Sequence, residues 1–511
     1  MELTKSRNRM TAGAAVSILD YGAALDGVTD DTAAWNAALA TGRNVVFPEG
    51  RSRITNRIAF STVRGQRLIG SGNNFSKFLV STDFNMAAAS VIRFQAIAQN
   101  LTSVGIDCFQ PSTNNRNNLV KYPWIVDCSD CPSSEIHDVW IAGCWNGVRL
   151  HGNCGQSVIN LLKVGGFNCD LHVDGSVDTV RIDHFHSWPL DFAGDANLMS
   201  IYSDRTRLAA EFGRVDDLDI GSIMTFQGRI RFANLSGLGH SFGVASRIAL
   251  DGTGARLEMD AGRMVVAAAY GTGGVLNESK IAVTNTGALT IAALYLFSVG
   301  STAPQSWAYV NGPLASLVIS SLLCEFRGDS RLLTCDDGGT LSVSSGSFVK
   351  EDNITRTQPV IHIVLGRSAI TGCTVNAPAG GTGPFILVDA DGQHTIVGNN
   401  FNGWGYLIPA EQSLGCYGPN AGVPQLAANA NYSGPVRVRK LTGTLNGSGV
   451  AVVDHGIVLA STRVVSLSTY YIGTNGELYP FLPVYLDGTE VGLDAGAEGA
   501  GKGYVALIQY V

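Results

Sequence analysis

The sequence predicts an all-β protein built as a parallel β-solenoid, and three observations lead to this prediction. The chain has 511 residues and is 45% hydrophobic, yet its apolar positions form no long helical stripes. Its 61 glycines favour turns, because glycine adopts positive φ at little steric cost. Short apolar strands recur at intervals of roughly 20 to 26 residues, and strand repeats of this length are typical of solenoids.

The clearest repeat lies between residues 342 and 401. Segments 342–348, 369–375 and 395–401 each contain a glycine after alternating polar and apolar residues, and these glycines, Gly346, Gly372 and Gly398, are 26 residues apart. One coil of such strands cannot bury its inner face alone, so coils stack and satisfy each other's backbone groups. The LxxLxL spacing of a leucine-rich repeat is absent from the sequence, and a propeller would need longer antiparallel units.

Charge and hydropathy exclude several classes of protein. The net charge is −7, from 35 basic and 42 acidic residues, and the pI is near 5.7, whereas nucleic-acid binders carry a basic footprint. The mean hydropathy of +0.15 is high, but no apolar run reaches the roughly 18 residues of a membrane span. We therefore expect no nucleic-acid partner and no membrane partner.

The two ends of the chain differ from the repeats. A helix is expected within Asp26–Ala40, with Thr29 or Asp30 as its N-cap, and beyond residue 130 only strands are expected. Longer strands near the C-terminus predict an antiparallel β-sandwich. The predicted parts are a flexible arm at 1–16, an N-terminal helical cap with the first coils at 17–130, the β-helix with a catalytic groove at 131–408, and the sandwich at 409–511.

The ten cysteines do not form the pattern of a disulfide scaffold. Cys128 and Cys131 make a lone CxxC without the second pair of a zinc ribbon, so we expect small buried thiols in a reducing compartment. The first ten residues are basic but lack the apolar stretch of a signal peptide. We expect a chain that is made in a cytoplasm and not exported by the general secretory route.

The stretch from Leu19 to about Gly72 resembles the opening of the pectate-lyase-like superfamily found in phage tailspikes and capsule depolymerases. The matching motifs, in order, are Asp20–Ala23, Asp26–Ala33, Val45–Gly50 and Leu68–Gly72. His184–Pro189 also resembles a segment of tailspike-like β-helix proteins. The resemblance implies a right-handed parallel β-helix that assembles as a homotrimer and binds and cleaves bacterial surface polysaccharide. The opening motif itself is structural and supplies no catalytic residue.

The same resemblance implies a place in the virion. Only about 16 residues precede the motif, so we expect a short arm that docks on a phage tail adaptor or on a second tailspike. Trimerisation is also expected on mechanical grounds, because the exposed edges of a solenoid are liabilities unless they are covered. The C-terminal sandwich is expected to hold the trimer together and to bind carbohydrate.

The richest stretch of polar residues runs from Asp183 to Arg231 and interrupts the regular spacing. Glycosidic hydrolysis needs two carboxylates, one of them protonated. The candidate catalytic residues are Glu211, Asp216, Asp217, Asp204 and Asp183. The expected substrate contacts are Trp188, His186, Tyr202 and Arg205, with Glu258 and Asp260 as outward strand positions facing the same groove. The alternative interpretation is a solvated loop with intersubunit ion pairs, in which Trp188 is a core aromatic.

Two other functions stay open. A polysaccharide lyase acting by β-elimination would use a base and a cation from Lys163, Arg181, His186, Tyr202 or Arg205. A non-catalytic adhesin would bind polysaccharide without cutting it. No cofactor or metal ion is expected, because no HExxH, P-loop or EF-hand spacing occurs, and His137, His151 and His172 are interpreted as hydrogen-bonded surface histidines.

Overall fold

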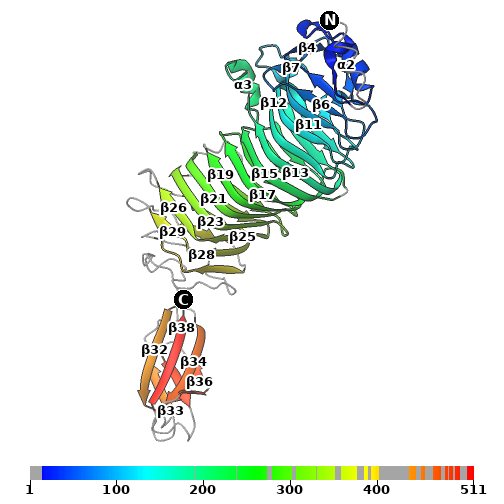
Figure 1. Cartoon of the computed structure of the whole chain (residues 1–511). Coiled ribbons are helices and arrows are strands. Elements are labelled where there is room, and N and C mark those ends of the chain that lie inside the picture. The colour runs from blue at the N-terminus through cyan, green and yellow to red at the C-terminus, as the bar shows by residue number, and fades with distance from the viewer. Residues whose placement is uncertain are drawn as a thin grey trace.

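The computed structural model describes residues 14–401, apart from 190–191, 238, 273–278, 302–305, 330, 351–357, 377–384 and 390–392, together with seven strands between residues 437 and 510. Strands β1 to β31 form one continuous sheet that winds into a stack of coils (Figure 1). Neighbouring coils pair in parallel along the whole stack. The predicted all-β class and parallel solenoid are confirmed, and the right-handed winding stays a prediction.

The first coils contain short strands and three short helices. Their elements are β1 (Val16–Ser17), η1 (Ile18–Tyr21), β2 (Asp26–Asp30), α2 (Thr32–Leu39), β3 (Val45–Phe47), β4 (Gly50–Ile54), β5 (Ile58–Ala59), β6 (Arg67–Gly70), β7 (Ser76–Val80), β8 (Ser90–Arg93), β9 (Asn100–Cys108), η2 (Arg116–Asn118) and β10 (Trp124–Asp127).

Longer strands that turn corners make up the central coils. They are β11 (Glu135–His151), β12 (Ser157–Asp174), β13 (Ser176–Ser187), β14 (Leu208–Phe212), β15 (Val215–Phe226), β16 (Arg229–Phe232), β17 (Phe242–Asp251), β18 (Arg256–Met259), β19 (Arg263–Thr272), β20 (Ile281–Thr284) and β21 (Ala288–Ser301), with helix α3 (Ala196–Tyr202) between β13 and β14.

The last coils return to short strands. They are β22 (Ala308–Asn311), β23 (Ser316–Gly328), β24 (Leu333–Asp336), β25 (Gly339–Ser344), β26 (Gly346–Lys350), β27 (Ile361–Ile363), β28 (Gly366–Thr371), β29 (Thr374–Asn376), β30 (Ile386–Val388) and β31 (His394–Val397).

Each central coil has three straight segments, and β12 shows all of them. Residues 157–159 and 162–164 pair with two successive parts of β13, and residues 169–173 pair with β14. The bend between the first two segments needs an unusual backbone, and Leu161 there has a φ of 56°. We call the outer surfaces of the three segments the first, second and third face. Inward side chains form one buried apolar cluster that extends from Val16 to Phe401.

Helix α2 begins at Thr32, so the prediction that Thr29 or Asp30 is the N-cap was wrong. The Asp30 carboxylate accepts hydrogen bonds from the Thr32 amide (3.0 Å) and hydroxyl (2.6 Å) without capping the helix. Asp31 holds the N-cap position, but its carboxylate accepts the Ala24 amide instead (2.7 Å). The helix contributes Trp35 to the core. That it caps the stack stays a prediction.

Helix α3 was not expected, because only strands were predicted beyond residue 130. Asp195 caps it by accepting hydrogen bonds from the Asn197 amide (2.9 Å) and the Leu198 amide (3.1 Å). Its buried residues, including Leu198 and Ile201, pack in a small separate cluster with Phe167. The helix forms because this loop has its own apolar contacts outside the coil.

The cysteines described by the structure are buried and form no disulfides, and burial raises the pKa of thiols such as that of Cys154, to about 12. Cys416 lies outside the described residues. No helix in the described part of the chain is long and apolar enough to cross a membrane.

The C-terminal strands form two antiparallel sheets. They are β32 (Arg437–Thr444), β33 (Val450–Asp454), β34 (Val464–Ile472), β35 (Leu478–Phe481), β36 (Pro483–Leu486), β37 (Glu490–Asp494) and β38 (Gly503–Tyr510). One sheet has the order β32-β38-β34-β35 and the other β33-β37-β36. The antiparallel pairing agrees with the strands expected there, and the packing of the two sheets as a sandwich stays a prediction.

Candidate functional site

A column of side chains runs along the second face because outward positions stay in register from coil to coil. Trp140, Lys163 and His186 are partners in β11, β12 and β13. The column continues through the coils that follow, at Met224, Ala249, Tyr270, Tyr295 and Leu323. The parallel stack therefore places a cation, an imidazole and several aromatic rings in one line.

A histidine–lysine cluster, which we define as Lys163, His184 and His186, lies beside two tryptophans. Lys163 and His186 belong to this column, whereas His184 is in register with Ser222 of the neighbouring column. The Lys163 Nζ atom is 5.1 Å from the centre of the Trp140 ring. The ring centres of His184 and His186 are 6.4 Å apart, and those of His186 and Trp188 are 5.3 Å apart. The cluster therefore combines nitrogen bases and a positive charge with flat aromatic surfaces.

The electrostatics of the cluster keep its imidazoles neutral. Burial lowers the pKa of His186 to about 4, and the nearby charges of His184 and Lys163 act in the same direction. Burial, Lys163 and Arg247 also lower the pKa of His184. The His186 Nε2 atom is buried and has no hydrogen-bond partner among the described residues. At neutral pH, His186 is thus an uncharged imidazole with one unpaired ring nitrogen.

A buried ion pair anchors the loop after β13, next to this cluster. Arg207 donates a hydrogen bond to Asp170 Oδ2 (2.7 Å) and another to Ser187 Oγ (3.0 Å). Ser187 is the last residue of β13, between His186 and Trp188. Burial raises the pKa of Asp170 to about 6, and the Arg207 charge opposes this effect. The Asp170–Arg207 ion pair therefore fixes the end of β13, where His186 and Trp188 lie on either side of Ser187.

A groove of about 320 Å³ continues along the second face toward the C-terminus. Its floor includes the small side chains of Ala268 and Ala293, and Tyr270 and Tyr295 stand beside them. The two tyrosine ring centres are 5.9 Å apart, close to the spacing of one coil step. Arg247, which also acts on His184, lines the groove. The groove therefore extends the surface that begins at the histidine–lysine cluster.

On the third face, charged residues alternate along the outward column. The order is Asp127, Arg149, His172, Glu211, Arg231 and Glu258, each in register with the next. Glu211 lies 3.2 Å from His172 Nδ1 and 3.4 Å from Arg231 Nη1. Partial burial acts to raise the pKa of Glu211, but the hydrogen bond from His172 and the charges of His172 and Arg231 outweigh it, so this pKa is lowered. Glu211 is therefore an ionised carboxylate.

The first coils of the chain match a known protein family. Residues 15–122 match the family model described as rhamnogalacturonase A/epimerase, pectate lyase-like. The chain carries a pectate-lyase-like domain. No curated protein matches the chain.

Several solved structures are similar to the chain at low identity. An α-1,3-glucanase catalytic unit from Streptomyces thermodiastaticus is 15% identical, with 81% of this chain and 70% of that chain covered and a TM-score of 0.31. A mannuronan C-5 epimerase module from Azotobacter vinelandii is 13% identical, with 80% and 99% covered and a TM-score of 0.35. A tailspike from Acinetobacter phage vb_AbaP_AS12 is 9% identical, with 77% and 69% covered and a TM-score of 0.39.

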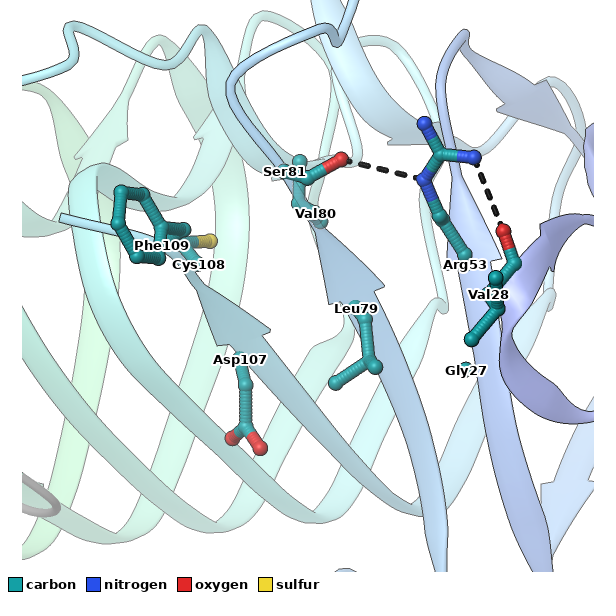
Figure 2. Close-up of a pocket in the computed structure, with 9 residues that line it drawn as sticks. All are labelled: Gly27, Val28, Arg53, Leu79, Val80, Ser81, Asp107, Cys108 and Phe109. Atoms are coloured by element: carbon teal, nitrogen blue, oxygen red, sulfur yellow. Dashed lines mark hydrogen bonds between the residues drawn. The ribbon is translucent and has the colours of Figure 1, made fainter.

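The pectate-lyase-like domain carries a larger cavity of about 490 Å³ on the same second face (Figure 2). Arg53, Leu79 and Asp107 line it and are register partners in β4, β7 and β9. Asp107 is in turn paired with Ala142 of β11. The Arg53 guanidinium donates to the Val28 carbonyl (3.0 Å) across this cavity wall. The histidine–lysine cluster therefore lies between two hollows on one face.

Among the predicted carboxylates, the structure brings Glu211, Glu258 and Asp260 onto the third face. Arg231 contacts both Glu211 and Asp260, the latter at 3.7 Å. Glu258 is paired with Arg229 (3.3 Å) and with Arg256. These residues therefore share a surface, but it is not the surface that carries His186 and Trp188.

The other four predicted carboxylates do not join that column. Asp216 is paired with Arg214 (2.9 Å), and Asp183 with Arg181 (2.5 Å). Asp217 accepts the Thr179 hydroxyl in the first segment (2.9 Å), and Asp204 accepts the Thr206 amide after helix α3 (2.7 Å). Each of them already has a structural partner, so the predicted acid–base set is scattered over different parts of the coil.

The loop residues Tyr202 and Arg205 lie in different environments. Tyr202 was expected to contact substrate, which requires an accessible ring. In the structure it is fully buried and packs between Phe167, Phe192 and Arg207. Arg205 is exposed near the end of the loop. Trp140, Tyr270 and Tyr295 were not among the residues predicted for the site. The usable signal was an equal spacing of 23 residues from Trp140 to Lys163 and from Lys163 to His186, which the structure converts into register partners.

Proposed function

We propose that the protein is a polysaccharide depolymerase that binds an anionic polysaccharide along the second face and cleaves it by β-elimination at the histidine–lysine cluster. The observation that carries this proposal is the neutral, partly buried imidazole of His186, in register with Lys163 and beside the Trp188 ring. This is the lyase alternative of the sequence analysis, and it takes precedence here over hydrolysis because each carboxylate predicted as catalytic already has a basic or hydroxyl partner.

The residues match the chemical needs of uronate elimination. The Lys163 ammonium would pair with the uronate carboxylate and stabilise the negative charge that develops when the neighbouring C5 proton leaves. A neutral His186 would accept that proton. The C5 electron pair then forms the C4–C5 double bond, the C4–O bond breaks, and the leaving oxygen takes up a proton from water. The bound carboxylate would also raise the pKa of His186 and so make it a stronger base.

The second face offers space for a polymer. From Trp140 to Tyr295 the column covers six coil steps, which at about 4.8 Å per step amounts to about 29 Å. Aromatic side chains present apolar faces on which sugar rings can stack, and Trp140, Trp188, Tyr270 and Tyr295 supply them. A chain running along the solenoid axis would meet the cluster between the two hollows.

The test is incubation with a panel of uronate-containing capsular polysaccharides. An active lyase creates an unsaturated uronate that absorbs in the near ultraviolet while the polymer shortens. Lys163→Met and His186→Gln should each lower the rate by at least 100-fold, and His240→Ala, a histidine outside the second face, should leave it unchanged. Cleavage at the wild-type rate in His186→Gln would refute this assignment.

Hydrolysis is the second candidate, because Arg231 contacts the two carboxylates Glu211 and Asp260. A hydrolase would release reducing ends without the ultraviolet chromophore, and Glu211→Gln or Asp260→Asn would abolish that release. The lowered pKa of Glu211 suits a base or nucleophile rather than an acid, so Asp260 would have to carry the proton. Unchanged polymer length together with binding would instead support the adhesin.

We also propose that the chain is a tailspike of a phage or prophage, as the resemblance of its opening motifs implies, and that it acts as a homotrimer. The exposed apolar pair Val244 and Val265, each 51% exposed and in register on the first face, is the surface that a second copy would cover. Val244→Asp combined with Val265→Asp should convert trimers to monomers in sedimentation. Most of the arm at 1–16 lies outside the described residues, and its deletion should abolish particle attachment while cleavage continues.

A further inference from the structure

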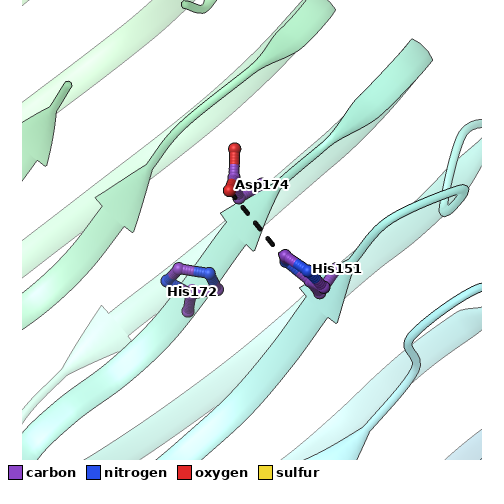
Figure 3. Close-up of side chains that lie close together, drawn as sticks. All are labelled: His151, His172 and Asp174. Atoms are coloured by element: carbon purple, nitrogen blue, oxygen red, sulfur yellow. Dashed lines mark ion pairs between the residues drawn. The ribbon is translucent and has the colours of Figure 1, made fainter. Parts of the chain in front are cut away.

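Two histidines and an aspartate meet at the ends of neighbouring strands on the third face (Figure 3). His151 ends β11, and His172 and Asp174 lie at the end of β12. One potential ligand atom from each of the three lies within 4.8 Å of the others. Two imidazole nitrogens with one carboxylate oxygen are a donor set that suits first-row transition metals, whereas Ca²⁺ and Mg²⁺ prefer oxygen ligands alone.

Asp174 is fixed in a way that leaves one of its oxygens available. The residue is 2% exposed, and its Oδ1 atom accepts hydrogen bonds from the Arg214 amide (2.8 Å) and the Ser236 hydroxyl (3.3 Å). A side chain at Gly213 would collide with this oxygen, so the backbone at Gly213 packs closely against the Asp174 carboxylate. No hydrogen bond reaches Oδ2 among the described residues, and this atom faces His151 Nδ1 at 4.0 Å. That distance is too long for a hydrogen bond.

His172 has the support that metal-bound histidines usually have. Its Nδ1 atom lies 3.2 Å from Glu211 Oε2, so a carboxylate orients the ring and leaves the other ring nitrogen for a ligand. The Trp124 ring packs against it, with the centres 5.8 Å apart. His172 is therefore held in place by two neighbours that do not belong to the three-residue cluster.

Binding of a metal ion requires the three ligand atoms to move closer together, and His151 is the residue whose side chain can move. Donor atoms around a tetrahedral ion with bonds of 2.0–2.1 Å are about 3.4 Å apart, so the three ligand atoms must approach by roughly 1 Å. The His151 side chain is 48% exposed and precedes Gly152, whose φ of 70° begins the turn. Its ring can swing at the strand end while Asp174 and His172 stay in place.

We propose that His151, His172 and Asp174 bind one Zn²⁺, Co²⁺ or Ni²⁺ ion per chain, with Glu211 orienting His172. The ion would join the adjacent coils of β11 and β12, so its role is to fix the stack and not to cleave the polysaccharide. It lies on the third face, whereas the histidine–lysine cluster lies on the second. The proposal therefore stands whether or not the lyase assignment is correct.

The test uses the full chain without a histidine tag. Titration with Co²⁺ should show one ion per chain with a micromolar or lower Kd, and the visible d–d absorption of a tetrahedral or five-coordinate Co²⁺ site. Competition with Zn²⁺ should remove that absorption. His151→Ala should weaken binding by at least 10-fold, and it is the safest variant because this side chain is half exposed. Asp174→Asn should weaken binding as strongly, and Glu211→Gln by about 10-fold.

Two controls separate a built site from adventitious binding. His240→Ala should leave the affinity unchanged, because this histidine lies outside the cluster. Thermal denaturation without metal should show that His151→Ala is folded, and added Zn²⁺ should raise the Tm of the wild type but not of this variant. The proposal is overturned if no saturable binding of one ion occurs below about 100 μM, or if His151→Ala binds Co²⁺ as tightly as the wild type.

Discussion

Replacing Arg207 with methionine should lower the free energy of unfolding by about 3–5 kcal/mol, the cost of leaving one partner of a buried ion pair alone. Arg207 is fully buried, and its guanidinium donates to Asp170, to Ser187 and to the Gln227 carbonyl, the last at 2.8 Å. Its charge also lies 3.8 Å above the Tyr202 ring. Methionine fills similar volume but offers no donor to any of these groups.

The pH dependence of this loss follows from Asp170. Burial already raises the pKa of Asp170 in the presence of Arg207, and removing the guanidinium would raise it further. A carboxyl with a raised pKa stabilises the folded state at low pH and loses that contribution as the pH rises through the folded value. The difference between wild type and Arg207→Met should therefore be largest near pH 8 and should shrink toward pH 4.

Urea denaturation at these two pH values measures the effect, and hydrogen exchange over residues 192–207 reports whether the loop opens first. Arg214→Met is the matched control, because the ion pair of Arg214 with Asp216 is partly exposed and its loss should lower the free energy of unfolding much less. The double variant Asp170→Leu with Arg207→Met should be more stable than Arg207→Met alone, since both charges are gone. Equal stability losses in Arg207→Met and Arg214→Met would refute this reasoning.

Three further perturbations test other parts of the structure. The low pKa of His186, about 4, predicts that the free energy of unfolding rises by about 1.5–2 kcal/mol between pH 4 and 6.5. This figure is roughly half of the value that the pKa difference gives without solvent screening, because the ring is partly exposed. His186→Gln should reduce that slope in urea titrations. Burial lowers the pKa of Lys280 to about 7, so its contribution to stability should grow from pH 7 to 10.5, and Lys280→Met should flatten this rise. Phe212→Ala should cost about 3–5 kcal/mol in calorimetry, because this buried ring stacks on Phe232 at 4.8 Å.

The repeat could be predicted from the sequence because the coil spacing is nearly constant at the C-terminal end. Residues 342, 369 and 395 are indeed register partners in β25, β28 and β31. Between β13 and β14 the spacing breaks, since helix α3 and its loop leave the coil there. The helix could not be predicted from periodicity, because its apolar residues pack in their own small cluster.

The candidate site was harder to predict, because neighbours in sequence point in different directions around a coil. Asp183 and His186 are three residues apart, but Asp183 pairs with Arg181 near a corner while His186 joins the column of Lys163. A run of charges along the chain is therefore spread over three faces. His151 and His172 are 21 residues apart and resemble no metal motif, yet one coil step brings their rings to 6.1 Å.

The parallel register along the second face has a consequence for how such a protein could change. Each coil contacts only the coils above and below it, so the loss or gain of one whole coil would alter the length of the stack without altering its fold. The distance from Lys163 to the tyrosines of the groove would then change in fixed increments of about 4.8 Å. Under the proposed function, such a change would fit the second face to a polymer with a longer or shorter repeating unit and would leave the proposed binding residues unchanged.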